Sequence, residues 1–354
     1  MTIFFVLAAT LLAVLLQWLS ARRGLQGLEG DCRPSTRMAE AGESFAIVVT
    51  LSNRSRRFFP FLRFQLQAPQ GMAIQQDKGV SPLVHGGTAV SGTTWLGPRQ
   101  RYEKRIPASA DARGRYLLLG LKISGGDFLG LSEYTESFGW GGEIVIPPKE
   151  APQAEIDAFF GGFLGDVSVS RFLFEDPVLT LGYREYTGRE PMKMISWVQS
   201  ARAGSLMVKK YDYTMEPSVC VMLNVDDPSA AHETLEHCFS LTRSVCQKLE
   251  DQGVKYAFRT NVRISGGMDA WYTISEGLGQ RHFQGILEGL GRATYTSAFS
   301  CRRLVEQAAG SHSTDNGLIF ITPGSSPGPE QDAQWLADTL GGTLCTIIPG
   351  RCGQ

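Results

Sequence analysis

The stretch 218-SVCVMLNV-225 decides the fold of the C-terminal half of this 354-residue chain. It is almost continuously apolar, which is typical of a strand buried on both faces of a sheet. Apolar residues at helical spacing follow over Ala230–Gln252, and this pattern stops at Gly253. A doubly buried strand followed directly by a helix is the repeating unit of an α/β sheet.

The same alternation continues to the C-terminus. Further strands are predicted over Val254–Phe258, Leu318–Thr322 and Thr343–Ile348, and further helices near Phe283–Leu290, Arg302–Ala309 and Pro329–Leu340. Strands separated by helices pair in parallel, because each connection crosses over the sheet. Residues 218–354 are therefore predicted to form an α/β doubly wound domain with a mostly parallel sheet.

Residues 30–148 show a different pattern, with short strands between turns rich in Gly and Asn. Strands are predicted over Ser44–Ser52, Phe58–Leu66, Arg101–Ile106 and Arg115–Ile123, and Pro60 indicates an edge strand or a bend. This spacing predicts an Ig-like β-sandwich. Residues 149–217 are then expected to be a linker that carries a distinctive charged and aromatic segment. The predicted fold class is α+β multidomain.

Composition limits the possible functions. The net charge is −1, with 43% apolar residues, so no excess of basic residues favours a nucleic-acid partner. The seven Cys are odd in number and form no C-x-x-C pair. Cys220, Cys238 and Cys246 lie in apolar surroundings, which predicts buried free thiols and a reducing compartment.

The N-terminus predicts a membrane anchor. Residues 2–19 are almost wholly apolar, and at about 1.5 Å per residue a helix of this length spans roughly a hydrocarbon core. Arg22 and Arg23 follow, which places the C-terminal side in the cytoplasm by the positive-inside rule. A single-pass cell-membrane protein with cytoplasmic domains is therefore expected. A cleaved signal peptide is the alternative, although no Lys or Arg precedes Ile3.

The distinctive segment is 182-GYREYTGREPMKMISWVQSARAGSLMVKKYDY-213. Its candidate interaction residues are Arg184, Glu185, Tyr186, Glu190, Lys193, Trp197, Arg202, Lys209 and Lys210. One interpretation is a cationic, aromatic docking surface for an acidic protein, favoured for Arg189 and the lysines because Lys is seldom fully buried. The other, favoured for Arg184, Glu185 and Trp197, is a buried salt-bridged network of Arg184, Glu185 and Arg202 that ties the sandwich to the α/β domain, with Trp197 as its apolar lid.

This segment resembles the signature of the bacterial "domain of unknown function 58" family. The resemblance rests on Arg184-Glu185-Tyr186, Gly188, Ile195, Trp197, Ser200-Ala201-Arg202, Leu206 and Val208. Gly188 stands where the family has Pro, and Lys193 where it has Arg. The resemblance implies a membrane-anchored protein with a von Willebrand factor type A-like domain. It also implies a working link to a MoxR-type AAA+ ATPase.

Type A domains can hold a metal at the end of their first strand, through a D-x-S-x-S pattern. The matching positions here are Asn224, Asp226 and Pro228, and Pro323 stands where a second Asp is wanted. Because Pro has no side-chain oxygen for Mg²⁺, we expect a degenerate, metal-free site at Asn224, Asp226 and Asp227. A weak cation site built from Asp226 and Asp227 is the alternative.

Motifs for catalysis are not found in the sequence. His232 and His237 are five residues apart, whereas a zinc helix needs its histidines four apart on one face. P-loop, dinucleotide-binding and G-x-S-x-G patterns do not occur. The prediction is therefore a non-enzymatic adaptor without a cofactor. An extracytoplasmic adhesion or envelope-binding module and an unrecognised hydrolase are the alternatives.

Overall fold

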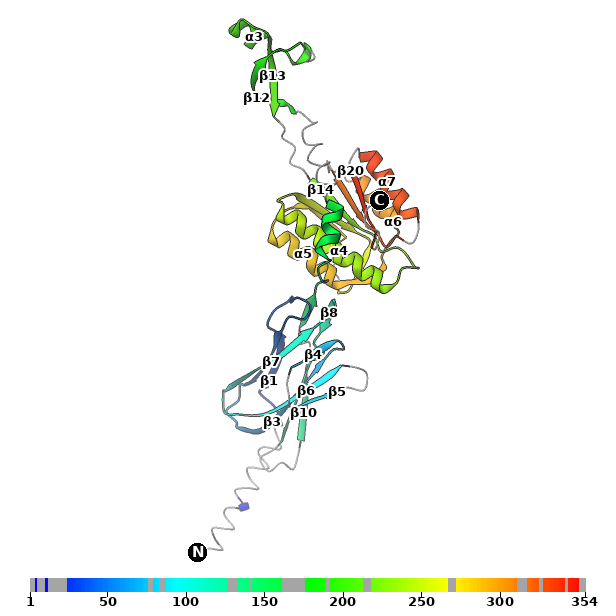
Figure 1. The fold of residues 1–354 in the computed structure, drawn as a ribbon. Coiled ribbons are helices and arrows are strands. Elements are labelled where there is room, and N and C mark those ends of the chain that lie inside the picture. The colour runs from blue at the N-terminus through cyan, green and yellow to red at the C-terminus, as the bar shows by residue number, and fades with distance from the viewer. Residues whose placement is uncertain are drawn as a thin grey trace. The chain divides into compact units, whose positions relative to one another are not determined.

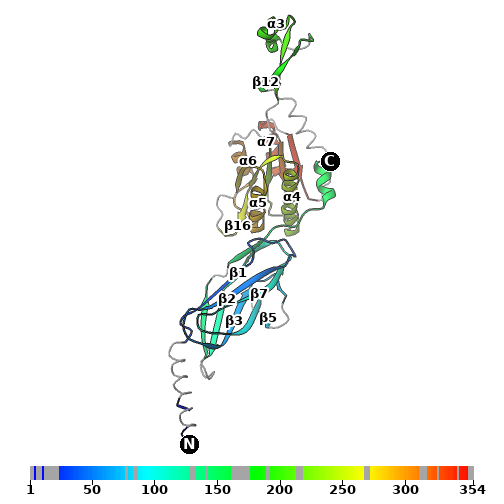
Figure 2. The same cartoon turned by 90° about the vertical axis from the view of Figure 1, so that its left-hand side faces the viewer.

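The computed structural model describes residues 4, 10–11, 24–75, 79–82, 87–126, 133–139, 142–160, 176–188, 192–212, 218–266, 272–310, 317–324, 327–340 and 343–349. The chain divides into two compact units, Met1–Lys149 and Glu150–Gln354. Their elements are labelled in Figure 1, and Figure 2 shows them turned by a quarter rotation.

Unit 1 is a β-sandwich. Its four-stranded sheet has the order β1-β2-β7-β4, and its five-stranded sheet has the order β10-β9-β3-β6-β5. The bounds are β1 Leu28–Pro34, β2 Phe45–Asn53, β3 Phe59–Ala68, β4 Met72–Ile74, β5 Val80–Pro82, β6 Thr88–Leu96, β7 Arg101–Ala110, β9 Leu121–Gly126 and β10 Glu133–Phe138. Strands β8 (Gly114–Leu117) and β11 (Glu143–Ile146) pair separately.

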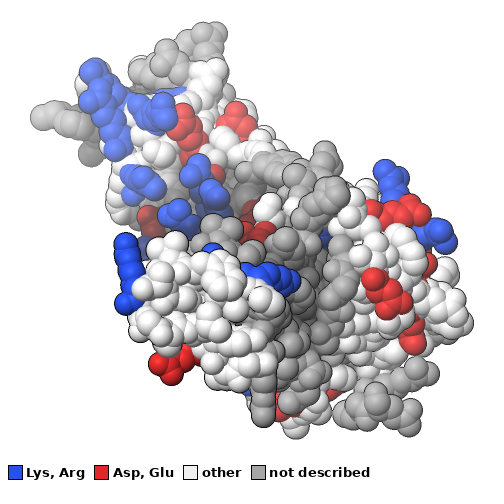
Figure 3. Space-filling model, turned by 90° about the horizontal axis from the view of Figure 1, so that it is seen from above, with Lys and Arg blue, Asp and Glu red and all other residues white. Residues whose placement is uncertain are grey.

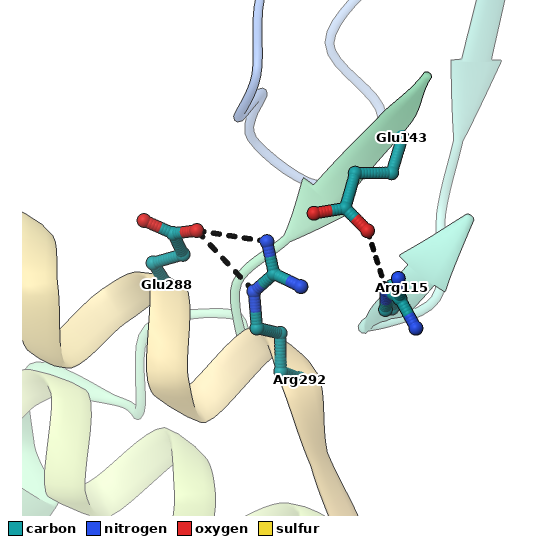
Figure 4. Close-up of polar contacts among 4 residues, drawn as sticks. All are labelled: Arg115, Glu143, Glu288 and Arg292. Carbon is teal, nitrogen blue, oxygen red and sulfur yellow. Dashed lines mark hydrogen bonds and ion pairs between the residues drawn. The ribbon is translucent and has the colours of Figure 1, made fainter. Parts of the chain in front are cut away.

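Alternation along the strands builds the sandwich core. Ile47, Val49 and Leu51 of β2 are fully buried, and so are Leu62, Phe64 and Leu66 of β3. Successive side chains of a strand point to opposite faces, so each sheet presents one apolar face to the other. An ion pair links β8 to β11, with 2.5 Å between Arg115 Nε and Glu143 Oε2 (Figure 4).

Two sequence expectations for the sandwich need correction. Pro60 was expected to mark an edge strand or a bend; the edge strand is wrong, because β3 lies between β9 and β6, whereas a register shift between Phe59 and Leu62 brackets Pro60 and agrees with a local irregularity of the strand. The single strand predicted over Arg115–Ile123 is two strands, β8 and β9. Gly120 separates them at φ 107°, a backbone conformation that ends a strand and that a residue with a Cβ rarely adopts.

Unit 2 contains a five-stranded sheet with the order β17-β15-β14-β19-β20. Strands β15, β14, β19 and β20 run parallel, and β17 is antiparallel to β15. The bounds are β14 Ser218–Leu223, α4 His232–Asp251, β15 Lys255–Thr260, β16 Val262–Ile264, β17 Thr273–Gly277, α5 Gln280–Arg292, β18 Ala293–Ser297, α6 Cys301–Gly310, β19 Gly317–Ile321, α7 Pro327–Leu340 and β20 Thr343–Ile347.

Helices cover both faces of this sheet. Val219 and Val221 of β14 pack in one apolar cluster with residues of α4 and α5. The intervening Cys220 and Met222 pack in a second cluster with residues of α6 and α7. The sandwiching helices are visible in Figures 1 and 2. On α5, Arg292 Nη2 lies 2.9 Å from Glu288 Oε1, one turn earlier (Figure 4).

The predicted α+β fold class is corrected, because strands dominate the structure, with 43% strand and 29% helix. One reason is that residues 149–217, expected to be a linker, contain β12 (Asp176–Glu185), a 3-10 helix η1 (Met192–Met194), α3 (Trp197–Ala203) and β13 (Met207–Asp212). A second reason is that β16, β17 and β18 were not predicted. They are short and carry few buried residues, so no long apolar run announces them.

The predicted transmembrane helix over residues 2–19 is also corrected. Within the part of the chain that the structure describes, no helix is long and apolar enough to cross a membrane. The longest described helix, α4, carries charged residues along its length, whereas a span needs about 20 mostly apolar residues. Of residues 2–19, all but Phe4, Thr10 and Leu11 lie outside the described residues. The single-pass location with cytoplasmic domains is not retained.

Candidate functional site

The distinctive segment, which belongs to unit 2, contains β12 and β13 paired as an antiparallel hairpin, and residues 176–212 are called the hairpin unit. Glu185 lies opposite Met207, and Arg184 lies opposite Val208. The chain between them folds back through η1 and α3. Two backbone bonds close this return, Tyr186 N–H to Leu206 O at 2.8 Å and Ser196 N–H to Met207 O at 2.8 Å.

Ser200 holds α3 against β13. Its hydroxyl donates to Ser196 O at 2.8 Å and accepts from Met207 N–H at 2.8 Å, so one side chain joins the first turn of the helix to the start of the strand. Gly204 ends the helix at φ 72°, and its N–H donates to Ser200 O. These left-handed caps favour glycine. Ser200 and Gly204 were not among the predicted site residues, although the helix-then-glycine pattern signals such a cap.

Five large apolar side chains among the residues of this segment whose burial is described are exposed. Ile195 and Val208, which form a β-bridge, are the buried pair. The exposed fractions are 42% for Tyr183, 69% for Met192, 62% for Trp197, 66% for Val198 and 44% for Leu206. We call these five residues the docking face. Large exposed apolar patches on soluble proteins usually mark interaction sites.

Charged residues accompany the docking face. Arg184, Glu185, Lys193 and Arg202 are exposed, and Tyr186 and Lys209 are half-buried. The interpretation of a buried network with Trp197 as its lid is therefore wrong, because its charged members and the indole reach solvent. Lys210 lies on β13 opposite Gly182, and Glu190 lies outside the described residues. Figure 3 shows Lys and Arg side chains interspersed with uncharged surface.

The second candidate site lies at the carboxyl ends of the parallel strands, where α/β sheets usually bind ligands. Asn224 follows β14 and is fully buried. Its Nδ2 donates to Thr322 Oγ1 at 3.2 Å, and its Oδ1 accepts from Asn261 Nδ2 at 2.8 Å and from Asp226 N–H at 3.0 Å. Asn261 Oδ1 in turn accepts from Val225 N–H at 3.0 Å. The polar groups at this edge therefore satisfy one another.

The two aspartates of the alternative cation site accept hydrogen bonds from different segments of the chain. Asp226 Oδ1 accepts from the Ser297 hydroxyl at 3.0 Å, and its Oδ2 accepts from Cys301 N–H, the first residue of α6, at 3.1 Å. Asp227 Oδ1 accepts from the N–H and the hydroxyl of Ser229. No group of three or more His, Cys, Asp or Glu within the described part could hold a metal ion. The donor set therefore does not favour the alternative of a cation site.

The predicted buried thiols are found where expected. Cys220, Cys238 and Cys246 are buried free cysteines. Burial raises the pKa of Cys238 to about 12, and burial followed by the nearby Asp332 and Asp226 carboxylates raises the pKa of Cys301 to about 12. Since the thiolate is the nucleophile, these raised pKa values suit packing rather than catalysis.

The two histidines of α4 contact different residues. The His232 ring is exposed and stacks on Tyr295, with 4.4 Å between ring centroids. The His237 Nε2 atom lies 2.9 Å from Glu155 Oε2. The two histidines therefore contact separate residues, as expected for side chains on the surface of α4 and not for two ligands of one metal ion.

No family model matches the chain, and no curated protein matches it. Among solved structures, a cohesin module of a Clostridium perfringens family 33 glycoside hydrolase is 12% identical and covers 33% of this chain and 96% of its own, with a TM-score of 0.25. A non-cellulosomal cohesin from Archaeoglobus fulgidus is 14% identical over 36% and 95%, with a TM-score of 0.23. A CARDB domain from Pyrococcus furiosus is 13% identical over 34% and 86%, with a TM-score of 0.21. At these TM-scores the likenesses carry no argument about function.

Proposed function

We propose that this chain is a non-enzymatic adaptor that binds a protein partner through the docking face of its β12–β13 hairpin unit. The observation that carries the proposal is the exposure of Tyr183, Met192, Trp197, Val198 and Leu206 on one small unit. A folded segment that leaves so many large apolar side chains in water gains free energy when a partner covers them.

The composition of the face fits a protein interface. Trp, Tyr and Arg are the residues that most often dominate binding energies, and Met is enriched in interfaces. Burying one large apolar side chain contributes about 1.5–3 kcal/mol. Besides Glu185, the same segment exposes three basic residues, Arg184, Lys193 and Arg202. They favour a partner with an acidic rim, because complementary charge guides association and selects the partner.

The partner class that we propose is a MoxR-type AAA+ ATPase. This part of the proposal rests on the resemblance of Arg184-Glu185-Tyr186 and Ser200-Ala201-Arg202 to the family signature. An adaptor of this kind would present its docking face to the ATPase, which would use ATP-driven motion to remodel complexes that the adaptor holds.

Co-purification of the full chain with a purified MoxR-type ATPase from the same source tests the proposal. Wild-type protein should retain the ATPase, with and without ATP compared in parallel. The variant Trp197→Ala combined with Met192→Ala should lose most of this retention. The matched control is Trp335→Ala, because Trp335 is another exposed tryptophan, on α7. Equal retention by all three proteins, or no retention by wild-type protein, would contradict the proposal.

A further inference from the structure

We propose that the sandwich of unit 1 binds the surface of an anionic lipid bilayer through an arginine–aromatic patch. The patch consists of Arg56, Phe58, Phe61, Arg63, Trp95 and Arg99. The bilayer surface alone is the ligand, and no membrane-spanning helix is needed. The proposal concerns a different unit from the docking face and is independent of the proposed function.

Three aromatic side chains of the patch project into solvent. Phe58, Phe61 and Trp95 are 51%, 45% and 57% exposed. The rings of Phe58 and Trp95 lie side by side, with 6.0 Å between centroids. Leu62 and Leu96 point into the core, so their neighbours Phe61 and Trp95 lie on the outer face of the five-stranded sheet. Phe and Trp side chains partition favourably into the interface of a bilayer.

Hydrogen bonds fix the loops that carry the patch. The buried Asn53 side chain donates from Nδ2 to Arg57 O at 2.6 Å and to Gly97 O at 2.8 Å. Arg99 N–H donates to Ser55 O at 3.0 Å. Residues 53–57 and 97–100 are thereby joined, and the patch is a surface formed before any ligand arrives. Pre-formed surfaces lose less conformational entropy on binding.

Positive charge is concentrated here in a chain whose net charge is −1. Residues 53–63 and 97–101 contain no Asp or Glu but carry Arg54, Arg56, Arg57, Arg63, Arg99 and Arg101. Arg54 pairs with Glu29 at 2.8 Å, and Arg57 donates to the carbonyl of Gln26. Among the described residues, Arg56, Arg63, Arg99 and Arg101 have no ion-pair partner. These arginines are available to bind phosphate groups.

A hollow that shares Arg63 with the patch has the chemistry of a headgroup site, and the Arg63 guanidinium lies 6.0 Å from the centroid of the Phe61 ring. Its volume is about 530 Å³, and its polar and charged lining includes Arg63, Gln65, Ser91, Thr93 and Lys104. The Lys104 ammonium lies 5.6 Å from the centroid of the Phe64 ring. Two cations and the Thr93 hydroxyl suit a phosphate, while the Ser91 hydroxyl donates to Gly79 O at 3.1 Å. A polar hollow next to exposed aromatics favours a lipid headgroup over a protein surface.

Vesicle flotation of the full chain tests the proposal. Vesicles of phosphatidylcholine with an equal part of phosphatidylglycerol should bind the protein at least about tenfold more strongly than phosphatidylcholine alone, because each arginine near an anionic surface adds to the attraction. The difference should shrink in high salt. Arg56→Glu combined with Arg99→Glu should lower binding to the anionic vesicles by roughly tenfold or more.

Matched variants separate the patch from other contributions. Arg263→Glu combined with Arg281→Glu makes the same charge change at exposed positions of unit 2 and should leave vesicle binding unchanged. Quenching of tryptophan fluorescence by brominated lipid should fall in Trp95→Phe but not in Trp335→Phe. The apolar residues 2–19 are present in every variant, so a difference in binding between variants arises from the substituted residues.

Four results would overturn the proposal. One is equal binding to both vesicle types, and another is an equal loss in the unit 2 control variant. The third is complete displacement from vesicles by millimolar inorganic phosphate, which would assign the hollow to a soluble anion. The fourth is displacement by a single-stranded DNA oligonucleotide that binds more tightly than the vesicles, which would assign the patch to nucleic acid.

Discussion

The side-chain amide of Asn224 donates a hydrogen bond of 3.2 Å to the hydroxyl of Thr322, and this bond joins the end of β14 to the end of β19. Asn261, which follows β15, donates to the same Asn224 side chain at 2.8 Å. Three neighbouring parallel strands are thus linked by uncharged polar groups at the edge where a ligand would bind. These bonds hold the loops that follow β14, β15 and β19 in fixed positions relative to one another.

Asn224→Ala should destabilise unit 2. The substitution removes the acceptor of two donors, Asn261 Nδ2 and Asp226 N–H, at a fully buried position. Leaving buried donors unsatisfied costs about 1–3 kcal/mol each. Urea unfolding should therefore show a loss of about 2–6 kcal/mol. Ser229→Ala, at an exposed position, is the control and should cost less. A loss below that of the control would contradict the role of Asn224.

Asp226→Ala should destabilise the start of α6. Its carboxylate accepts from Cys301 N–H at 3.1 Å, and negative charge is favourable at a helix N-terminus. A lost cap of this kind costs about 0.5–2 kcal/mol. Amide hydrogen exchange of the first turn of α6 should become faster, while exchange in α4 stays the same. Unchanged protection of α6 would show that the bond does not stabilise the helix.

The buried thiols predict a loss of stability at alkaline pH. Burial raises the pKa of Cys238 to about 12 and that of Cys345 to about 11, whereas an unfolded thiol titrates near about 8.5. Above that pH the unfolded chain binds fewer protons than the folded chain. The free energy of unfolding should therefore decrease as pH rises, by up to about 1.4 kcal/mol per pH unit for each such thiol.

Urea titrations of unit 2 between about pH 8 and pH 11 measure this slope across the range in which these thiols differ. Cys238→Ala is the informative variant, because it removes one of the titrating groups. Its free energy of unfolding should be lower at pH 8 and should depend less steeply on pH. A slope equal to that of wild-type protein would show that Cys238 ionises equally in both states.

The sequence predicted elements wherever burial left a periodic pattern. The run at Ser218–Val225 became β14, and the helical spacing after it became α4, because a doubly buried strand and an amphipathic helix have distinct periods. The β12–β13 hairpin was missed for the opposite reason. Among the residues of this segment whose burial is described, Ile195, Ser196 and Val208 are buried, so no long apolar period identifies the hairpin.

Of the five residues of the docking face, only Trp197 was among the predicted interaction residues, and the arrangement was not predicted. The composition of 182–213 indicated an interaction surface, yet it could not tell an exposed Trp197 from a buried one. That distinction depends on Ser200, whose hydroxyl joins Ser196 and Met207 and so fixes the orientation of α3. A hydrogen bond that joins two elements produces no periodic pattern of apolar residues, so it cannot be predicted from the sequence.

Ser200→Ala should weaken partner binding more than it weakens the fold of unit 2. The alanine keeps the helix but loses both hydroxyl hydrogen bonds, each worth about 0.5–1.5 kcal/mol. The docking face should then lose its fixed geometry. We expect a severalfold weaker affinity for the ATPase with an unchanged urea midpoint of the five-stranded sheet. Ser205→Ala, at an exposed position of the same unit, should bind like wild-type protein.

The dissociation constant of the full chain with a purified MoxR-type ATPase, compared between wild-type protein and Trp197→Ala, tests the central claim most directly. Trp197 is 62% exposed, so its removal should leave the thermal midpoint unchanged. If the hairpin unit is the binding surface, the affinity should fall by at least about tenfold, as for a central aromatic contact residue. An unchanged affinity, or no binding by wild-type protein, would contradict the account.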